Sequence, residues 1–282
     1  MSGEPHTLVT GASGLIGRAL VEALAATRPV LAVSRREAGL ALPTLRADFT
    51  DPAALEALRE YRIGAAVHLA AVTGGCSEAD GLRVNVAGTR GLLRALVDQG
   101  CRRIVLASSI AAVGFAHPAF RPVALPIPDD HPCLAREAYG LSKALMEEVA
   151  AYFARQSPDL DLLCLRLPSI SADARLPALR GAGPLGAWAL GGITVMALSD
   201  AVRLLSLALD APARPGLRVR NAAPARAWSA GPVAAVLAGW YGDRPDLEAF
   251  RRPGHEFDSP FDSRRLAQEL GFEARVLGPQ AR

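Results

Sequence analysis

Short apolar runs alternate with longer amphipathic stretches through the first two thirds of the chain. Apolar and β-branched residues dominate the short runs, which we predict to be strands at 6–10, 30–34, 65–70, 103–107 and 161–165. Apolar residues recur at helical spacing in the longer stretches, 14–26, 52–61, 78–98 and 137–156. This alternation is typical of βαβ units, whose parallel strands form one sheet with helices on both faces. The predicted fold class is therefore α/β, a doubly wound parallel sheet of the Rossmann type.

The pattern becomes less regular after residue 168. Residues 169–192 are rich in Ala, Gly, Pro and Leu and show no clean periodicity. Further helix-like and strand-like runs follow at 199–210, 217–221, 229–241 and 263–270. We therefore expect a main domain, formed by residues 1–167 with about 199–221, and a small C-terminal lobe, formed by residues 168–198 with about 222–282.

The composition is that of a soluble globular protein, since half of the 282 residues are hydrophobic and 21% are charged. The N-terminus has Glu4 and Pro5 where a signal peptide would have a basic and then an apolar segment. The longest apolar stretch, 185–198, is interrupted by glycines and is too short to cross a bilayer. We therefore expect a cytoplasmic protein without a membrane span.

Charged residues and potential metal ligands are dispersed along the chain. The 31 basic residues are mixed with 28 acidic ones, for a net charge of +3, and form no basic run. The four cysteines, Cys76, Cys101, Cys133 and Cys164, are far apart in sequence, and the five histidines are scattered as well. We expect reduced thiols, no metal site and no nucleic-acid partner.

A glycine-rich turn follows the first predicted strand and opens the first predicted helix, with the sequence GASGLIG. In a βαβ unit the first glycine permits the tight turn, the second lets the backbone approach a pyrophosphate, and the third permits close helix packing. The N–H groups of the helix N-terminus bind the phosphates. The pattern predicts a dinucleotide-binding main domain, with contacts from Gly11, Gly14, Leu15, Ile16 and Gly17, and leaves the small lobe to bind substrate.

The second predicted strand ends in Ser34-Arg35-Arg36, at the place where NAD-binding units usually have a carboxylate for the ribose. A carboxylate would repel a 2′-phosphate, whereas adjacent guanidinium groups can bind one through paired hydrogen bonds. We therefore predict NADP as the cofactor, with NAD as the alternative.

Tyr139 and Lys143 lie four residues apart in a predicted helix, so that their side chains share a face. An unperturbed tyrosine has a pKa near 10 and needs a nearby cation to serve as an acid or base at neutral pH. Of the 31 basic residues, Lys143 is the one lysine and the others are arginine. An ammonium is compact enough to bind a ribose hydroxyl, which gives a reason for lysine at this position.

A further predicted strand ends in Ser108-Ser109, where an open α/β sheet places its ligand. The Ser109 hydroxyl could hydrogen-bond a substrate carbonyl or hydroxyl. We therefore predict Ser109, Tyr139 and Lys143 as the catalytic residues.

These motifs resemble the extended short-chain dehydrogenase/reductases, also called the NAD-dependent epimerase/dehydratase family. The resemblance runs from Thr7 to about Pro168 and returns at 261–272. Its motifs are GASGLIG, Ala47-Asp48-Phe49, His68-Leu-Ala-Ala71, Asn85-Val-Ala-Gly-Thr89, ASSIAAVGF, YGLSK and LRLP.

The resemblance implies a role for each matching position. Tyr139 would be the acid-base residue, Lys143 its pKa-lowering and ribose-binding partner, and Ser109 the residue that polarises the substrate oxygen. The remaining positions implied to contact or lie near the cofactor are Asp48, Phe49, Leu69, Ala70, Ala71, Asn85 and Pro168.

The segment after Pro168 departs from members of the family that act on nucleotide sugars. Those members usually have an Asn here and a longer insertion, whereas this chain reads Pro168-Ser-Ile-Ser and has only a short segment before Ser199-Asp200. A small pocket is expected. Short members such as the uronate dehydrogenases act on free sugar acids, and SSIAAVGF is similar to their serine segment.

The prediction is an NADP-dependent oxidoreductase that moves hydride between the nicotinamide and a small alcohol or ketone. A nucleotide-sugar epimerase or 4-ketoreductase is the alternative; transient oxidation followed by epimerisation needs an additional base, for which Glu137 and His131 are the nearest candidates in sequence. A non-catalytic dinucleotide sensor is an alternative of another class, which the presence of Tyr139 and Lys143 disfavours. The resemblance also suggests a homodimer, in which the helices at 78–98 and 137–156 pair across a two-fold axis.

Overall fold

Seven parallel strands form the main sheet of the computed structural model, which describes residues 4–37, 39–181, 183–242 and 246–276. Their order across the sheet is β3 (Thr44–Arg46), β2 (Val30–Ser34), β1 (His6–Thr10), β4 (Ile63–His68), β5 (Arg103–Ser109), β6 (Asp161–Leu167) and β9 (Gly216–Asn221). The winding direction reverses between β1 and β4, which is where doubly wound sheets bind their ligands. The predicted fold class is confirmed.

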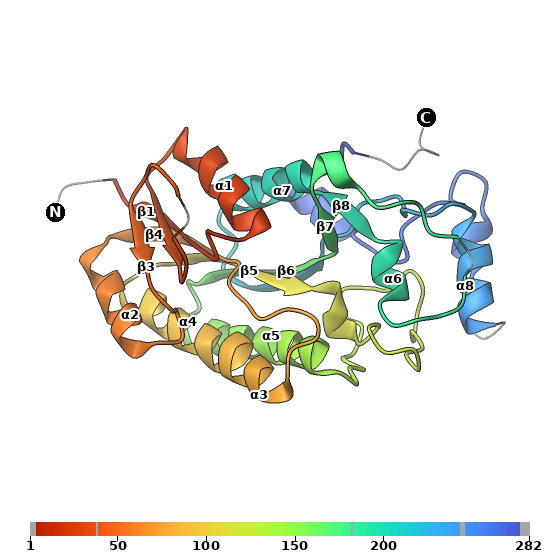
Figure 1. Ribbon diagram of the computed structural model, residues 1–282, viewed down its shortest axis with the longest axis horizontal. Coiled ribbons are helices and arrows are strands. Elements are labelled where there is room, and N and C mark those ends of the chain that lie inside the picture. Colours follow the sequence, from red (N-terminus) through yellow and green to blue (C-terminus); the bar gives the residue numbers. More distant parts are fainter. Residues whose placement is uncertain (1–3, 38, 182, 243–245, 277–282) are drawn as a thin grey trace.

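Helices cover both faces of this sheet (Figure 1). One face carries α1 (Leu15–Ala25) and α7 (Leu198–Asp210), while the other carries α2 (Pro52–Ala57), α4 (Thr89–Asp98) and α5 (Ala138–Gln156). Asp51 begins α2, because its carboxylate accepts a hydrogen bond from the Ala53 N–H and Pro52 follows it. Among the described helices, none is long and apolar enough to cross a bilayer.

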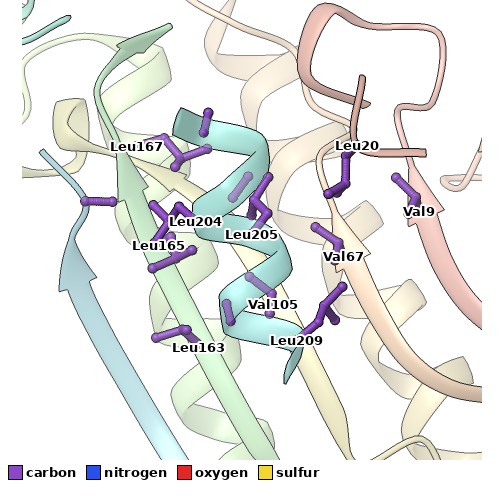
Figure 2. Packing of buried hydrophobic residues seen from close by; sticks show 14 of the residues in the cluster. Val9, Leu20, Val67, Val105, Leu163, Leu165, Leu167, Leu204, Leu205 and Leu209 are labelled. Carbon is purple, nitrogen blue, oxygen red and sulfur yellow. The ribbon is translucent and has the colours of Figure 1, made fainter. Parts of the chain in front are cut away.

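The strands are buried on both faces, which is why they read as continuous apolar runs. Along β5, Val105 faces α1 and α7, whereas Ile104 and Leu106 face α4 and α5. Figure 2 shows the first of these layers, where Leu204 and Leu205 of α7 pack over the sheet.

A smaller region lies beside the carboxyl end of the sheet (Figure 1). It contains the parallel strands β7 (Ser169–Ser171) and β8 (Val195–Ala197) and the helices α6 (Ala189–Gly192) and α8 (Val233–Tyr241). Its apolar core includes Phe115, Leu190, Val236, Phe250 and Phe261. The last described helix, α9 (Arg264–Leu270), instead packs Leu266 and Leu270 into the core beneath α7. The division into two domains stays a prediction. The packing shows that α9, expected in the small lobe, contacts the core of the main sheet.

The long helix expected at 78–98 is interrupted. It consists of a short α3 (Glu78–Asp80), a π-helical segment (Gly81–Gly88) and α4. The Phe49 ring packs so closely on Gly88 that a Cβ there would lie 2.8 Å from it. β3, β7 and β8 were not predicted, because three residues are too few to show a periodic pattern.

Candidate active site

A cavity of about 520 Å³ opens at the carboxyl ends of β1, β4 and β5. It brings together nearly all of the predicted site residues. Those that line it are Gly11, Gly14, Leu15, Ile16, Gly17, Ser34, Arg35, Arg36, Asp48, Phe49, Leu69, Ala70, Ala71, Ser109, Tyr139, Lys143 and Pro168. The roles of these residues stay predictions, but the fold brings them together around one cavity.

The glycine-rich turn has no room for side chains at two of its positions. Gly11 has a φ of +72°, and a Cβ on it would lie 2.9 Å from the backbone nitrogen of Ala70. A Cβ on Gly17 would collide with the carbonyl oxygen of Gly11. At Gly14, the N-cap of α1, no side chain of the described residues caps the helix, so its first-turn N–H groups remain available to an anion.

A buried histidine, His68, lies next to the glycine-rich turn and holds the residue before it. The His68 Nδ1 lies 2.7 Å from the hydroxyl of Thr10, and its Nε2 lies 3.0 Å from that of Thr89. The Thr10 hydroxyl also accepts hydrogen bonds from the N–H groups of Leu69 and Ala70, each at 3.2 Å. Burial, aided by the Lys143 charge, lowers the pKa of His68 to about 3, so the ring is neutral. Thr10 was not among the predicted site residues, although it directly precedes Gly11.

Hydroxyl and guanidinium groups lie at the end of β2. The Ser34 hydroxyl donates to that of Ser13 over 2.7 Å and accepts from the Arg36 N–H over 3.2 Å. The exposed Arg35 guanidinium lies 3.9 Å from the Asp48 carboxylate. This end of the cavity therefore offers several donors for a negatively charged group.

Asn85 is the one predicted cofactor-binding residue that does not line the cavity. Its amide nitrogen donates to the Val72 carbonyl and to the Ser142 hydroxyl, both at 2.9 Å, and its oxygen accepts from the Val72 N–H at 2.9 Å. The side chain thus ties the loop after β4 to α5. A buried amide held in this way positions that loop, and both of its N–H groups are used within the protein.

Tyr139 and Lys143 project from the first turns of α5 toward the end of β5. Glu137 begins this helix, because its carboxylate accepts the N–H groups of Tyr139 at 2.8 Å and Gly140 at 2.6 Å. The Lys143 ammonium donates to the Ala107 carbonyl over 2.7 Å and lies 5.8 Å from the centroid of the Tyr139 ring. The two side chains and Ser109 therefore meet at one end of the cavity.

Burial sets the protonation of both groups. Burial raises the pKa of Tyr139, and a hydrogen bond with Ser109 opposes this shift. Burial also lowers the pKa of Lys143 to about 8, a shift that the Glu147 carboxylate opposes. Because its pKa is raised above the ordinary value near 10, the Tyr139 phenol is protonated at neutral pH. That Lys143 lowers the pKa of Tyr139 stays a prediction; its ammonium is engaged with the Ala107 carbonyl.

A buried ion pair behind Lys143 was missed by the sequence analysis. Arg166 donates to both carboxylate oxygens of Glu147, at 2.9 and 2.8 Å, and Ser108 donates to the same carboxylate at 2.5 Å. Another Arg166 nitrogen donates to the Asp129 carbonyl at 2.8 Å. The available signal was the position of Glu147, four residues after Lys143 and on the same helix face.

The two candidates for an additional base have other partners. Glu137 is held by the start of α5, as described above. His131 donates from Nδ1 to the Pro132 carbonyl over 2.8 Å and accepts at Nε2 from the Val123 N–H over 3.1 Å. Neither is among the cavity-lining residues of the described chain.

Known proteins are similar to this chain in sequence and in fold. The chain is 37% identical over 128 residues to D-erythronate dehydrogenase of Cupriavidus necator, a match that covers 44% of this chain and 37% of that protein. It is 31% identical over 157 residues to UDP-glucose 4-epimerase of Azospirillum brasilense, covering 51% of this chain and 43% of that protein. The chain thus spans less than half the length of these relatives.

A solved structure matches nearly the whole chain. MoeE5 in complex with UDP-glucuronic acid and NAD is 26% identical, with a TM-score of 0.69 over 96% of this chain and 94% of that one. The model of the NAD-dependent epimerase/dehydratase family matches residues 7–175, more than half of the sequence. The family match confirms the resemblance. The chain therefore belongs to the NAD-dependent epimerase/dehydratase family.

Proposed function

We propose that this protein is an oxidoreductase that transfers hydride between a nicotinamide cofactor and the carbinol or carbonyl carbon of a small substrate. The observation that carries the proposal is a cavity lined both by the glycine-rich turn and by Ser109, Tyr139 and Lys143. Groups suited to binding a dinucleotide and groups suited to moving a proton open into the same space.

The cavity residues fit a nicotinamide dinucleotide. Glycines at 11 and 17 permit the tight turn and the close packing of α1 against it, and the α1 N-terminus at Gly14 offers N–H groups to a pyrophosphate. Ser34 and Arg35 line the cavity at the end of β2, and donors at this place favour a 2′-phosphate, which is the reason to propose NADP as the preferred form. MoeE5 was solved with NAD, so the preference needs its own test. Calorimetric titration with both cofactors provides it: tighter binding of NADP supports the preference, and equal or tighter binding of NAD overturns it.

When bound, the nicotinamide supplies the chemistry of hydride transfer. In the direction of reduction, the protonated Tyr139 hydroxyl gives its proton to the carbonyl oxygen of the substrate. The Ser109 hydroxyl would hold the same oxygen by a hydrogen bond. The Lys143 ammonium would stabilise the phenolate that remains and would bind the ribose. In the direction of oxidation the deprotonated Tyr139, a phenolate stabilised by the Lys143 ammonium, would take up the hydroxyl proton of the substrate.

Small hydroxy acids are the substrates that we propose to test first, since one relative is a D-erythronate dehydrogenase. The experiment is a screen of four- to six-carbon hydroxy acids with NADP and with NAD, followed by the absorbance of the reduced nicotinamide. Formation of reduced cofactor with at least one such acid supports the proposal. Absence of turnover across the screen, in either direction and with either cofactor, contradicts it.

A nucleotide-sugar epimerase or 4-ketoreductase is the second candidate. It is favoured by the match to MoeE5, which was solved with UDP-glucuronic acid and covers nearly the whole chain. Titration with UDP distinguishes the two candidates. Micromolar binding of UDP favours the second candidate, and undetectable binding favours the small substrate.

We further propose that the protein is a cytoplasmic homodimer. The four cysteines are free thiols, which is typical of a reducing compartment. Leu141 and Tyr152 of α5 and Leu82 of the neighbouring π-helical segment are exposed apolar side chains, which a second copy of the chain could cover. Sedimentation velocity tests this, since a monomer at micromolar concentration contradicts it.

A further inference from the structure

Trp188, directly before α6, has an unusual backbone conformation. Its φ is +64°, in the left-handed region that a bulky side chain seldom adopts. The conformation is held by its neighbours, because the Trp188 N–H donates to the Ala116 carbonyl over 3.3 Å and its carbonyl accepts the Gly192 N–H over 3.1 Å. Strained residues persist where the surrounding structure fixes them, and they often serve a site.

The indole of Trp188 is wedged between parts of the molecule that are distant in sequence. Its ring centroid lies 5.8 Å from that of Phe115, edge to face, and 6.0 Å from that of Tyr139. On another side it packs on Gly74, where a Cβ would lie 2.9 Å from the indole Cζ2. Glycine at 74 thus leaves space that the indole fills.

This position borders the reacting end of the cavity. Tyr139 and Thr73 line the cavity, and Trp188 contacts Tyr139 and the residue next to Thr73. Trp188 is not itself among the described residues that line the cavity; it lies beside the cavity, where a substrate that extends from Tyr139 past the lining would meet the indole. The side chain is 37% exposed, so part of the ring faces open space.

We propose that Trp188 is a specificity-determining wall, which limits the substrate to a small hydroxy acid or ketone and excludes a nucleotide-linked sugar. This deepens the proposed function and rests on it. An aromatic ring fixed between Gly74, Phe115 and Tyr139 moves less than a free surface side chain, so it limits the size of what reaches Tyr139.

The first test compares Trp188→Gly with Trp188→Phe. Glycine tolerates the left-handed backbone and removes the wall, whereas phenylalanine keeps a ring. We measure kcat/KM for D-erythronate and for six-carbon D-gluconate, and the affinity for UDP-glucose by calorimetry. Trp188→Gly is expected to shift the ratio of the two kcat/KM values at least tenfold toward D-gluconate or to gain measurable UDP-glucose binding, and Trp188→Phe to change less. An unchanged ratio, together with unchanged UDP-glucose binding, overturns the proposal.

A second test needs no turnover and separates this proposal from the proposed function. The other two tryptophans, Trp228 and Trp240, are only 8% and 7% exposed, so acrylamide quenches mainly the fluorescence of Trp188. D-Erythronate at concentrations that calorimetry shows to bind should protect Trp188 from quenching, and the effect should vanish in Trp188→Phe. Binding without protection overturns the proposal even if the protein is an active dehydrogenase. The unmodified protein could turn over no hydroxy acid while a bound hydroxy acid still protects Trp188 from quenching. That result would contradict the proposed function but support the role of Trp188.

The contact with Gly74 gives a third test. Gly74→Ala places a methyl group against the indole and should raise KM for the small substrate. In the Trp188→Gly background the same change should have little effect, because the clashing ring is gone. Additive effects of the two substitutions contradict a wall formed by this contact.

Discussion

The two ends of the cavity are built differently. At the glycine-rich turn, the dinucleotide end is formed by backbone: Gly11 and Gly17 exclude side chains, and the Thr10 hydroxyl and His68 hold the adjoining loops. The reacting end is formed by side chains from separate segments, among them Tyr139 and Trp188. Backbone geometry is insensitive to most substitutions, whereas one side chain can change a pocket wall. The dinucleotide end therefore suits a cofactor that stays the same, whereas single substitutions at the reacting end can change which substrate fits.

The strongest effect is expected at the reacting end. Tyr139→Phe removes the hydroxyl that we propose to move the proton and should lower kcat by about 10²- to 10⁴-fold, while the cofactor affinity at the other end stays close to its original value. Steady-state kinetics and calorimetry measure the two quantities. Tyr152→Phe, on the exposed side of the same helix, is the matched control and should change neither. A kcat close to normal in Tyr139→Phe would exclude this residue from the reaction.

The buried ion pair behind Lys143 should matter for stability at the reacting end. Glu147→Ala leaves the Arg166 guanidinium buried without its carboxylate, which should lower the free energy of unfolding by about 3–5 kcal/mol. Denaturant titration measures this. Glu148→Ala changes the neighbouring exposed carboxylate and should stay within about 0.5 kcal/mol of the original. Equal effects of both substitutions would show that the ion pair is not important for stability.

Acid should destabilise the dinucleotide end through His68. The pKa of His68 is about 3 in the folded protein and 6.5 in the unfolded chain. Between pH 3 and pH 6.5 the unfolded chain therefore binds a proton that the folded protein does not. Stability is therefore full above pH 6.5 and falls as the pH drops toward 3, by up to about 1.4 kcal/mol per pH unit from this group. His68→Asn should reduce the slope measured by denaturant titration, with His255→Asn at an exposed histidine as the control. An identical slope in His68→Asn would contradict a neutral buried ring.

The smallest effect is expected in cofactor preference. Ser34→Asp places a carboxylate where a 2′-phosphate would lie and should shift the ratio of NADP to NAD affinity by about ten- to a hundredfold toward NAD. Ser34→Asn has a similar size without the charge and should shift it less. Calorimetry with both cofactors measures the ratio. If Asp and Asn give the same ratio, charge at this position does not select the cofactor.

Residues in local motifs could be predicted from the sequence, whereas contacts between distant segments could not. GASGLIG and YGLSK are local motifs whose geometry follows from one strand, one turn or one helix, so most of the residues that line the cavity were identifiable. Asn85 lies on the expected segment, but its side chain turns to Val72 and Ser142, which no local pattern indicates. Trp188 reaches Gly74 across more than a hundred residues, in a segment without periodicity, so its position depends on tertiary packing.

The central claim is that hydride passes between the substrate carbon and the nicotinamide in this cavity. The most direct measurement uses hydroxy acids of four to six carbons, each deuterated at its secondary carbinol carbons, with NADP or NAD and mass spectrometry of both products. The account predicts deuterium in the reduced nicotinamide, formed with a rate that falls strongly in Tyr139→Phe. Reduced nicotinamide without deuterium, or no reduced nicotinamide with any of these acids, would contradict it.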